Sequence, residues 1–292
     1  MPNRVDDSEM ARRTEDFVVR RIEGDDLDLP ALPPVAAQAL ELLEDPAFSA
    51  EVVTRLIEND PLVAARVLRL ANSAAHATLE PARSVIQAVM RLGSDELRTF
   101  LIETAAKPLF ESHDRSINAL CRELWTHSVA VGLLARAIVR RGKGAHPEAA
   151  YLGGLLHDVG KPIIAAMLLD AEQRLFGTHT RTWLVPATWL ALIGRVHRRV
   201  GTALAAAWRL PALVLQSVRD GTAYDRLAPS NPVNAVTFGN ALAKHAGIYA
   251  GDVDPAEIAA FLETGRILFK LGDADVQALT DGLRQRVTER LT

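Results

Sequence analysis

The strongest chemical feature of the sequence is the dipeptide His157-Asp158, which stands at the expected end of a helix and precedes Gly160 and Lys161. Imidazole and carboxylate groups are both good ligands for divalent metal ions. Adjacent positions on a helix diverge by about 100°, so the two side chains converge on one ion only where the helix frays, as Gly160 and Pro162 favour. Taken alone, such a dipeptide is more often a hydrogen-bonded pair or a helix cap than a metal site.

Two further histidines have spacings that bring them to the same place. His127 lies thirty residues before His157 on the preceding long helix, and an antiparallel helix pair returns His157 to its side. His197 follows forty residues after His157. By spacing, His127, His157, Asp158 and His197 form a candidate metal cluster. Lys161 adds a cation that either pairs with Asp158 or contacts a phosphate.

Other common catalytic motifs are absent from the sequence, which contains no glycine-rich phosphate loop and no serine nucleophile motif. Its one cysteine, Cys121, cannot form an internal disulfide, and this fits a reducing compartment. We predict that it is a small buried side chain within a helix. The remaining histidines have no partner pattern and are predicted to be ordinary core or surface residues: His76, His113, His146, His179 and His245.

The composition favours an all-helical protein of the cytoplasm. Hydrophobic residues make up 49% of the 292 residues and aromatic residues only 5%, so the core is aliphatic and rich in strong helix formers. A formal net charge of −3 lacks the basic excess of a nucleic-acid binder. The short basic cluster at Arg140, Arg141 and Lys143 is predicted to end a helix, where cations complement the dipole. Neither a signal peptide nor a membrane span is predicted.

The elements that must position the candidate residues are predicted to be helices joined by short loops. Residues 1–26 read as a leader that is mobile or partly helical, and the prolines of residues 29–34 then impose an extended path. Ser49 and Asp60 are predicted helix caps, and Gly93 a helix end. Helices are predicted over residues 116–141, from Pro147 to the His-Asp pair, and over 163–176, 184–194, 198–208, 212–219, 231–249 and 254–290, the last broken near Gly272.

Six motifs follow one another in order along residues 27–220, about two thirds of the chain. They are LPALP from Leu29, IENDP from Ile57 with VLRLANSA from Val67, SVIQAV from Ser84 with Leu92-Gly93, LWTHS from Leu124, GGLLHDVGK from Gly153, and HRRVG from His197 with WRLP from Trp208. Together they resemble the HDOD domain, the HD-related output domain of bacterial signalling proteins.

The resemblance implies an all-α, two-lobed helical fold with an HD-like core. Residues 27–115 would form a short-helix lobe and residues 116–220 an HD-like lobe, with the helices of residues 221–292 packed on the latter. In the related HD phosphohydrolases, histidines and aspartates hold a metal that activates water against a phosphoester. By position, the resemblance assigns His127, His157 and Asp158 to that metal. If the chain is a phosphohydrolase, His197 would complete the ligand shell.

Two departures from the family pattern predict a weakened metal site. Phosphodiesterase relatives carry a histidine pair where this chain reads Val218-Arg219-Asp220-Gly221. Asn240 stands where a late aspartate is expected, and an uncharged amide is a poorer ligand for a divalent cation.

The leading functional hypothesis is a bacterial signalling or regulatory module without robust hydrolase activity. On this hypothesis the chain is not an enzyme. It would act through signalling proteins or a nucleotide or other phosphate-containing ligand, as a monomer or a homodimer, with no nucleic acid or membrane partner. One alternative is a metal-dependent phosphohydrolase with a divalent ion as cofactor, and loss of bound metal in His127→Ala would favour it. The other is a structural helical scaffold, in which His157→Ala lowers the melting temperature but leaves partner binding intact.

Overall fold

The structure is a computed structural model that describes residues 7–24, 27–45, 47–73, 76, 78, 80–176, 186–221 and 223–291. Every regular element in these ranges is a helix, which confirms the predicted all-α class. By backbone contacts the chain forms two compact units. The smaller is Ala31–Pro108, and the larger joins Met1–Pro30 to Leu109–Thr292.

The smaller unit is an array of short helices whose starts the sequence marks. Ser49 accepts a hydrogen bond from the Val52 amide at 3.4 Å, and Asp60 accepts from the Leu62 amide at 3.0 Å. These side chains satisfy amides that the first turn of a helix leaves unbonded, so both predicted caps are confirmed. The helices are α2 (Pro34–Leu42), α3 (Ala50–Glu58), α4 (Pro61–Ala71) and α5 (Val85–Ala106), followed by the 3₁₀ helix η1 (Lys107–Phe110).

Gly93 divides α5 into two helical stretches at the position where the sequence predicts a helix end. Its φ of 72° lies in the left-handed region, which glycine adopts without the steric penalty of a side chain. Asn72 then ties the end of α4 to the start of α5, because its side-chain amide donates to the Ala82 carbonyl and its side-chain oxygen accepts from the Ala82 amide. The interior is aliphatic and includes the fully buried Val53, Ile57, Val67, Leu97 and Leu101.

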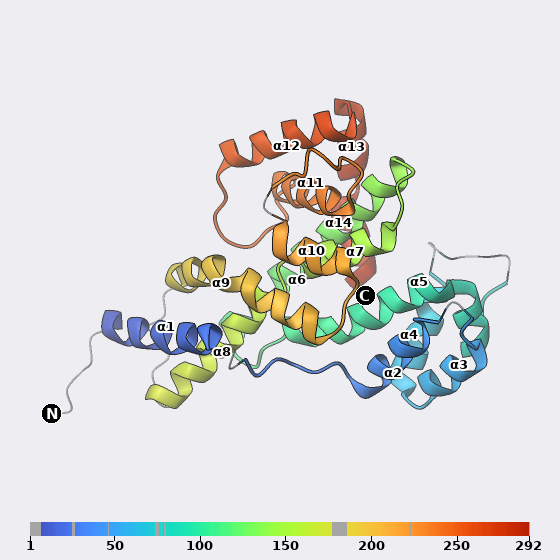
Figure 1. Ribbon diagram of the computed structural model, residues 1–292, viewed down its shortest axis with the longest axis horizontal. Coiled ribbons are helices and arrows are strands. Elements are labelled where there is room, and N and C mark those ends of the chain that lie inside the picture. The colour runs from blue at the N-terminus through green and yellow to red at the C-terminus, as the bar shows by residue number, and fades with distance from the viewer. Residues whose placement is uncertain are drawn as a thin grey trace. The chain divides into compact units, whose positions relative to one another are not determined.

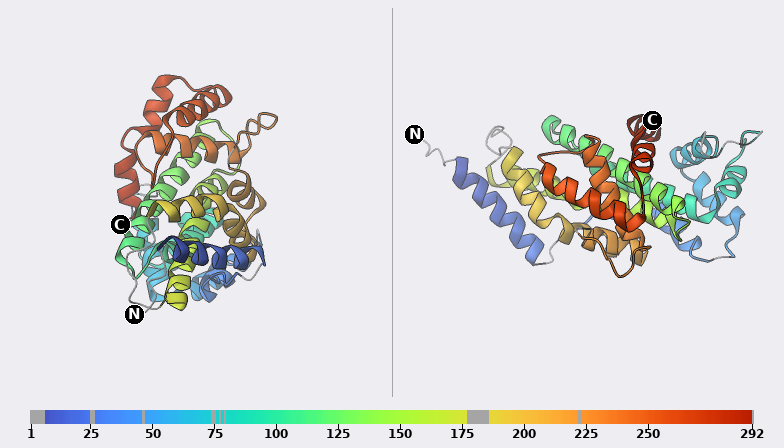
Figure 2. Two further views of the ribbon diagram at one scale, coloured as in Figure 1. Left: turned by 90° about the vertical axis from the view of Figure 1, so that its left-hand side faces the viewer. Right: turned by 90° about the horizontal axis from the view of Figure 1, so that it is seen from above.

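The larger unit contains all of the candidate site residues. Its helices are α1 (Asp7–Glu23), α6 (Arg115–Arg141), α7 (Pro147–Leu156), α8 (Gly160–Phe176), α9 (Pro186–Ala207), α10 (Ala212–Asp220), α11 (Pro232–His245), α12 (Pro255–Phe269), α13 (Asp273–Thr280) and α14 (Leu283–Leu291). The long helix α6 packs against α7 and α11, while α8 pairs with α9 (Figure 1). Helix α1 packs across α8 (Figures 1 and 2). The predicted break near Gly272 is confirmed, since it separates α12 from α13.

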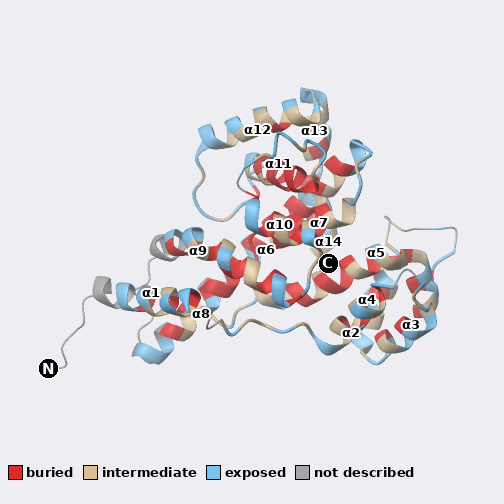
Figure 3. Cartoon of the chain, in the orientation of Figure 1, coloured by how far each residue is buried: buried red, intermediate tan, exposed pale blue. Residues whose placement is uncertain are grey.

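The centre of this unit is formed by α7 and α11, which Figure 3 draws almost entirely as buried. Side chains are buried from Ala150 to Leu156 in α7 and from Pro232 to Gly239 in α11. By length and composition alone, the stretch Pro147–Leu175 is apolar enough to cross a membrane, but 78% of its most apolar window is buried inside the molecule. Burial of this extent is what the core helix of a globular unit requires.

Two predicted boundaries are wrong. The helix expected over residues 254–290 is divided a second time, between Thr280 and Leu283. Two helices were expected over residues 184–194 and 198–208, whereas α9 runs without interruption from Pro186 to Ala207, and residues 184 and 185 lie outside the described part. Helix α9 continues through the exposed Gly194, where a side chain would meet no atom within 4 Å. Glycine in a helix interior lowers helix stability only modestly, and packing of α9 on α8 and α10 offsets that loss.

The N-terminal segment packs with the larger unit. Helix α1 buries Thr14, Val18 and Ile22, and it contacts α8 and α9. Further along, the indole N–H of Trp208 donates to the Pro30 carbonyl at 2.7 Å. This bond joins the first and the last of the six sequence motifs.

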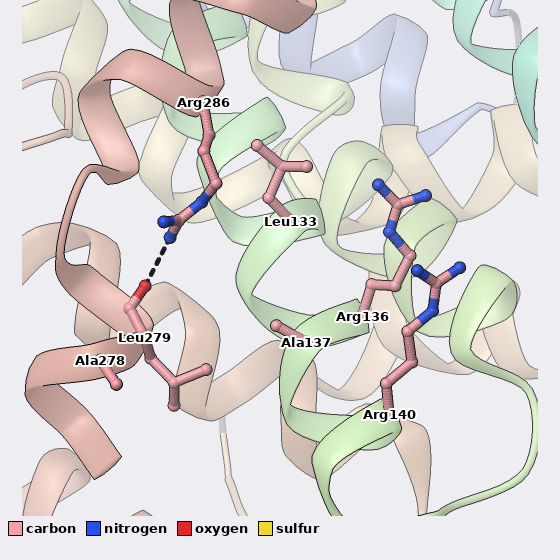
Figure 4. A pocket seen from close by; sticks show the side chains of 7 residues that line it. All are labelled: Leu133, Arg136, Ala137, Arg140, Ala278, Leu279 and Arg286. Atoms are coloured by element: carbon pink, nitrogen blue, oxygen red, sulfur yellow. Dashed lines mark hydrogen bonds between the residues drawn. The ribbon is translucent and has the colours of Figure 1, made fainter. Parts of the chain in front are cut away.

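The C-terminal helices α13 and α14 pack against α6, and Arg141 of α6 pairs with Asp275 of α13. Figure 4 shows the residues between them. A pocket of about 290 Å³ lies between α6, α13 and α14, with Leu133 and Leu279 among its lining residues. The guanidinium groups around it are engaged with the protein: Arg286 donates to the Leu279 carbonyl at 2.7 Å, and Arg140 pairs with Glu148 at 2.7 Å. Arg140 and Arg141 end α6 as predicted. We therefore interpret this pocket as a gap between packed helices and not as a ligand site.

Candidate metal centre

His157 and Asp158 lie in the tight turn that joins α7 to α8. His157 keeps helical dihedral angles, and the Lys161 amide donates to the Asp158 carbonyl at 2.9 Å as α8 begins. The turn brings the His157 Nε2 atom to 3.3 Å from the Asp158 Oδ2 atom. The adjacent residues that diverge on a regular helix therefore converge here.

The other two histidines reach the same carboxylate from separate helices. His127 on α6 places its Nε2 atom 4.0 Å from Asp158 Oδ2, and its ring centroid lies 5.3 Å from that of His157. His197 on α9 places its Nε2 atom 3.3 Å from Asp158 Oδ1. The structure thus brings all four residues of the predicted cluster together.

Glycines allow the helices around this cluster to approach closely. A side chain on Gly154 of α7 would lie 2.7 Å from the backbone of Gly132 in α6, which is one crossing of those helices. A side chain on Gly160, at the start of α8, would lie 1.9 Å from the His197 carbonyl oxygen. Neither crossing leaves room for a methyl group, so these two glycines set the distance between the elements that carry the histidines.

Each histidine is oriented by a hydrogen bond from its other ring nitrogen to a backbone carbonyl. The Nδ1 atom lies 2.7 Å from the Ile248 carbonyl in His127, 2.7 Å from the Gly154 carbonyl in His157, and 2.9 Å from the Gly194 carbonyl in His197. A carbonyl oxygen only accepts, so each Nδ1 must carry a proton. In a neutral imidazole the Nε2 atom is then unprotonated and carries a lone pair that can bind a metal ion.

This arrangement fits a bound cation. The Nε2 atoms of the three histidines face one carboxylate, and the His157 Nε2 atom is buried without a hydrogen-bond partner. One ligand atom from each of His127, His157 and Asp158 lies within 4.8 Å of the others, a spacing that a single ion can bridge. Histidines that bind metals characteristically donate their second N–H to a carbonyl or carboxylate, as here.

The cluster is almost completely buried. The exposed fractions are 3% for His127, 3% for His157, 4% for Asp158 and 8% for His197. Burial, and to a smaller extent the charge of the nearby His157, lowers the pKa of His127 to about 3. The His127 ring is therefore neutral at pH 7. Burial alone would raise the pKa of Asp158, but His157 and Lys161 lower it well below its ordinary value. The carboxylate is therefore charged in the fold.

Lys161 is paired with Asp158. Its Nζ atom lies 2.5 Å from Asp158 Oδ2. Of the two alternatives that the sequence leaves open, pairing with Asp158 or contact with a phosphate, the structure shows the pairing. The Lys161 side chain is 24% exposed, against 6% for the Asp158 side chain. It is the most accessible group in contact with the carboxylate among the described residues.

Two further cations that respond to Asp158 were not predicted from the sequence. Burial lowers the pKa of Arg198 and of Lys244, and the negative charge of Asp158 acts against both shifts. Arg198 directly follows His197 in the sequence. Lys244 follows Asn240 by one turn of α11. The signals were therefore adjacency and helical spacing, and neither is specific enough to use without a structure.

The two departures from the family pattern make no hydrogen bond or ion pair with the cluster among the described residues. Arg219 and Asp220 pair with each other at 2.8 Å, with both side chains largely exposed at the end of α10. Asn240 lies on α11, and its Oδ1 atom is buried without a hydrogen-bond partner. Within the described part of the chain, Asp158 is the one carboxylate in contact with the three histidines.

Comparison with solved structures shows the same fold in several bacterial proteins. A candidate metal-dependent phosphohydrolase from Shewanella amazonensis SB2B matches with a TM-score of 0.69 and 20% identity, over 94% of this chain and 99% of that one. An HDOD domain protein of unknown function from Geobacter sulfurreducens matches with a TM-score of 0.62 and 24% identity, over 95% and 96%. A candidate signal transduction protein from Marinobacter aquaeolei VT8 matches with a TM-score of 0.63 and 22% identity, over 99% and 66%. At these identities the likeness shows the fold alone.

A curated relative and a family model extend the comparison to sequence. An uncharacterized protein of Treponema pallidum (strain Nichols) is 25% identical over 194 residues, which are 66% of this chain and 37% of the relative. The chain thus spans well under half of that protein's length. The model of the HDOD domain matches residues 29–223. The chain therefore belongs to the HDOD domain family.

Proposed function

We propose that this chain is a cytoplasmic bacterial signal-transduction module that acts through a partner protein or a phosphate-containing ligand and does not hydrolyse phosphoesters efficiently. Membership of the HDOD family supports the signalling role. A protein named for signal transduction has a similar fold. The lone cysteine, Cys121, cannot form an internal disulfide and so fits a reducing compartment. Burial raises the pKa of its thiol to about 11.

The state of Asp158 is the observation that carries this proposal. The carboxylate already contacts Lys161 at 2.5 Å, and no member of the cluster is more than 8% exposed. Hydrolysis requires that an ion, a water and a phosphoryl group meet at one accessible point. A closed cluster with one neutralised carboxylate does not offer that point, whereas a signalling core needs only a stable arrangement that a ligand or partner can alter.

A divalent ion nevertheless fits the ligand atoms. His127, His157 and Asp158 would hold it, while the His197 Nε2 atom faces the other oxygen of the carboxylate at 3.3 Å. When bound, such an ion polarises a phosphoryl oxygen and lowers the pKa of a bound water. Asn240 contributes no negative charge, so the ion would retain more positive charge than with a second carboxylate, and its affinity would be lower.

The second candidate function is a metal-dependent phosphohydrolase. The observation that favours it is the buried His157 Nε2 atom, which has no hydrogen-bond partner and faces the carboxylate. Elemental analysis separates the candidates in part, since metal near one equivalent that falls in His127→Ala supports a metal site. Only turnover identifies a hydrolase.

We expect no hydrolysis by the purified wild-type chain. The assay uses cyclic dinucleotides and a generic phosphodiester with saturating Mn²⁺ or Mg²⁺, and the expected rate equals that of His157→Ala, because the substrate cannot reach the buried cluster. His245→Ala, an exposed histidine on α11, serves as the matched control. Turnover that is present in the wild type and in His245→Ala but lost in His157→Ala would overturn the proposal.

A further inference from the structure

One oxygen of Asp158 faces both the lysine and the candidate metal ligands. The Oδ2 atom lies 2.5 Å from Lys161 Nζ, 3.3 Å from His157 Nε2 and 4.0 Å from His127 Nε2. The Oδ1 atom instead faces His197 Nε2 at 3.3 Å. An ion bridging His127, His157 and Asp158 would therefore use the oxygen that the ammonium group now holds.

The Lys161 ammonium group and a divalent ion would compete for the Asp158 Oδ2 atom. A buried carboxylate needs a compensating positive charge, and Lys161 supplies it within the chain. A divalent ion at the same oxygen would place two positive centres within a few ångströms of each other at a site with little water to screen them. Binding of the ion would thus weaken the hold of the carboxylate on the ammonium group.

The position of Lys161 favours its departure. It stands in the first turn of α8, where the positive end of the helix dipole repels a cation, so Asp158 is what holds it there. Its side chain is 24% exposed and has a flexible four-carbon stem. A small rotation therefore returns the ammonium group to water, while the buried histidines stay in place.

We propose that Lys161 is a built-in competitor for a divalent ion, and that ion binding at His127, His157 and Asp158 displaces its ammonium group to the surface. Binding of an ion in the buried cluster would thus move the positive charge of Lys161 to the surface at the start of α8. The inference about Lys161 rests on the proposed function, because it assigns a regulatory role to the same site.

The first test is a calorimetric titration of Mn²⁺ into the full, chelator-treated chain. Lys161→Met is expected to bind Mn²⁺ at least tenfold more tightly than the wild type. Lys244→Met is the matched control, because it also removes a positive charge that responds to Asp158 but does not touch it, and its affinity should change less than threefold. Equal gains in both variants, or no gain in Lys161→Met, would overturn direct competition.

The second test follows the lysine itself. Acetic anhydride labelling read by mass spectrometry is expected to modify Lys161 several-fold faster when Mn²⁺ is present, with the exposed Lys270 as an internal reference whose labelling stays constant. Unchanged or slower labelling of Lys161 at saturating Mn²⁺ would contradict displacement. Absence of Mn²⁺ binding in both the wild type and Lys161→Met would also overturn the inference, while leaving the expected absence of hydrolysis standing.

Discussion

Gly160→Ala is expected to lower the free energy of unfolding by about 3 kcal/mol or more, the upper range for forcing a methyl group into a packed interior. The added Cβ would lie 1.9 Å from the His197 carbonyl oxygen and 2.9 Å from the Gly201 amide nitrogen. Backbone atoms cannot rotate away as a side chain can, so α8 and α9 must separate. Separation moves His197 away from Asp158, and chemical denaturation should show the loss.

Gly194→Ala is the matched control for this experiment. It lies on α9 near the same crossing, but a side chain there meets nothing within 4 Å. Replacing an exposed glycine in a helix by alanine stabilises by roughly 0.5–1 kcal/mol. Wild-type stability in Gly160→Ala would mean that the close approach of α8 and α9 is not required for the fold.

Acid is expected to destabilise the metal-free protein through His127. Burial lowers the native pKa of His127 to about 3, whereas an unfolded histidine titrates near 6.5. Between these two pH values the unfolded chain binds the proton and the native chain does not. The free energy of unfolding therefore decreases by up to about 1.4 kcal/mol for each pH unit by which the pH is lowered. Asp158, whose native pKa is also lowered, adds a loss in the same direction once the pH falls below about 4.

Urea unfolding in the presence of a chelator, from pH 7 to pH 4, measures this slope. His127→Gln removes the titrating group and should reduce the slope by about one proton, while His245→Gln, on the exposed face of α11, should leave it unchanged. A slope that is the same in all three proteins would place the origin of the acid sensitivity elsewhere.

Local signals were sufficient to predict most helices and the candidate cluster. Ser49, Asp60 and Gly93 mark element boundaries by side chain or backbone chemistry that acts within a few residues. The return of His157 to the side of His127 follows from an antiparallel helix pair with a short connection. These predictions succeeded because each depends on geometry that neighbouring residues determine.

The features that the sequence did not predict depend on contacts that residue spacing does not contain. The carbonyl partner of His127 is that of Ile248, 121 positions away in the chain. The choice of Lys161 between Asp158 and a phosphate depends on a side-chain rotamer and on burial. The continuity of α9 through Gly194 depends on packing against α8 and α10, which overrides a weak local preference.

The role of His127, His157 and Asp158 as one cation site is tested most directly by anomalous diffraction from crystals of the full chain soaked in Mn²⁺. We expect a single anomalous peak bounded by the two imidazole Nε2 atoms and the carboxylate, with the Lys161 ammonium group withdrawn from Asp158. Crystals that take up Mn²⁺ only at other positions, or that show no peak within the cluster while Lys161 remains on Asp158, would contradict the assignment.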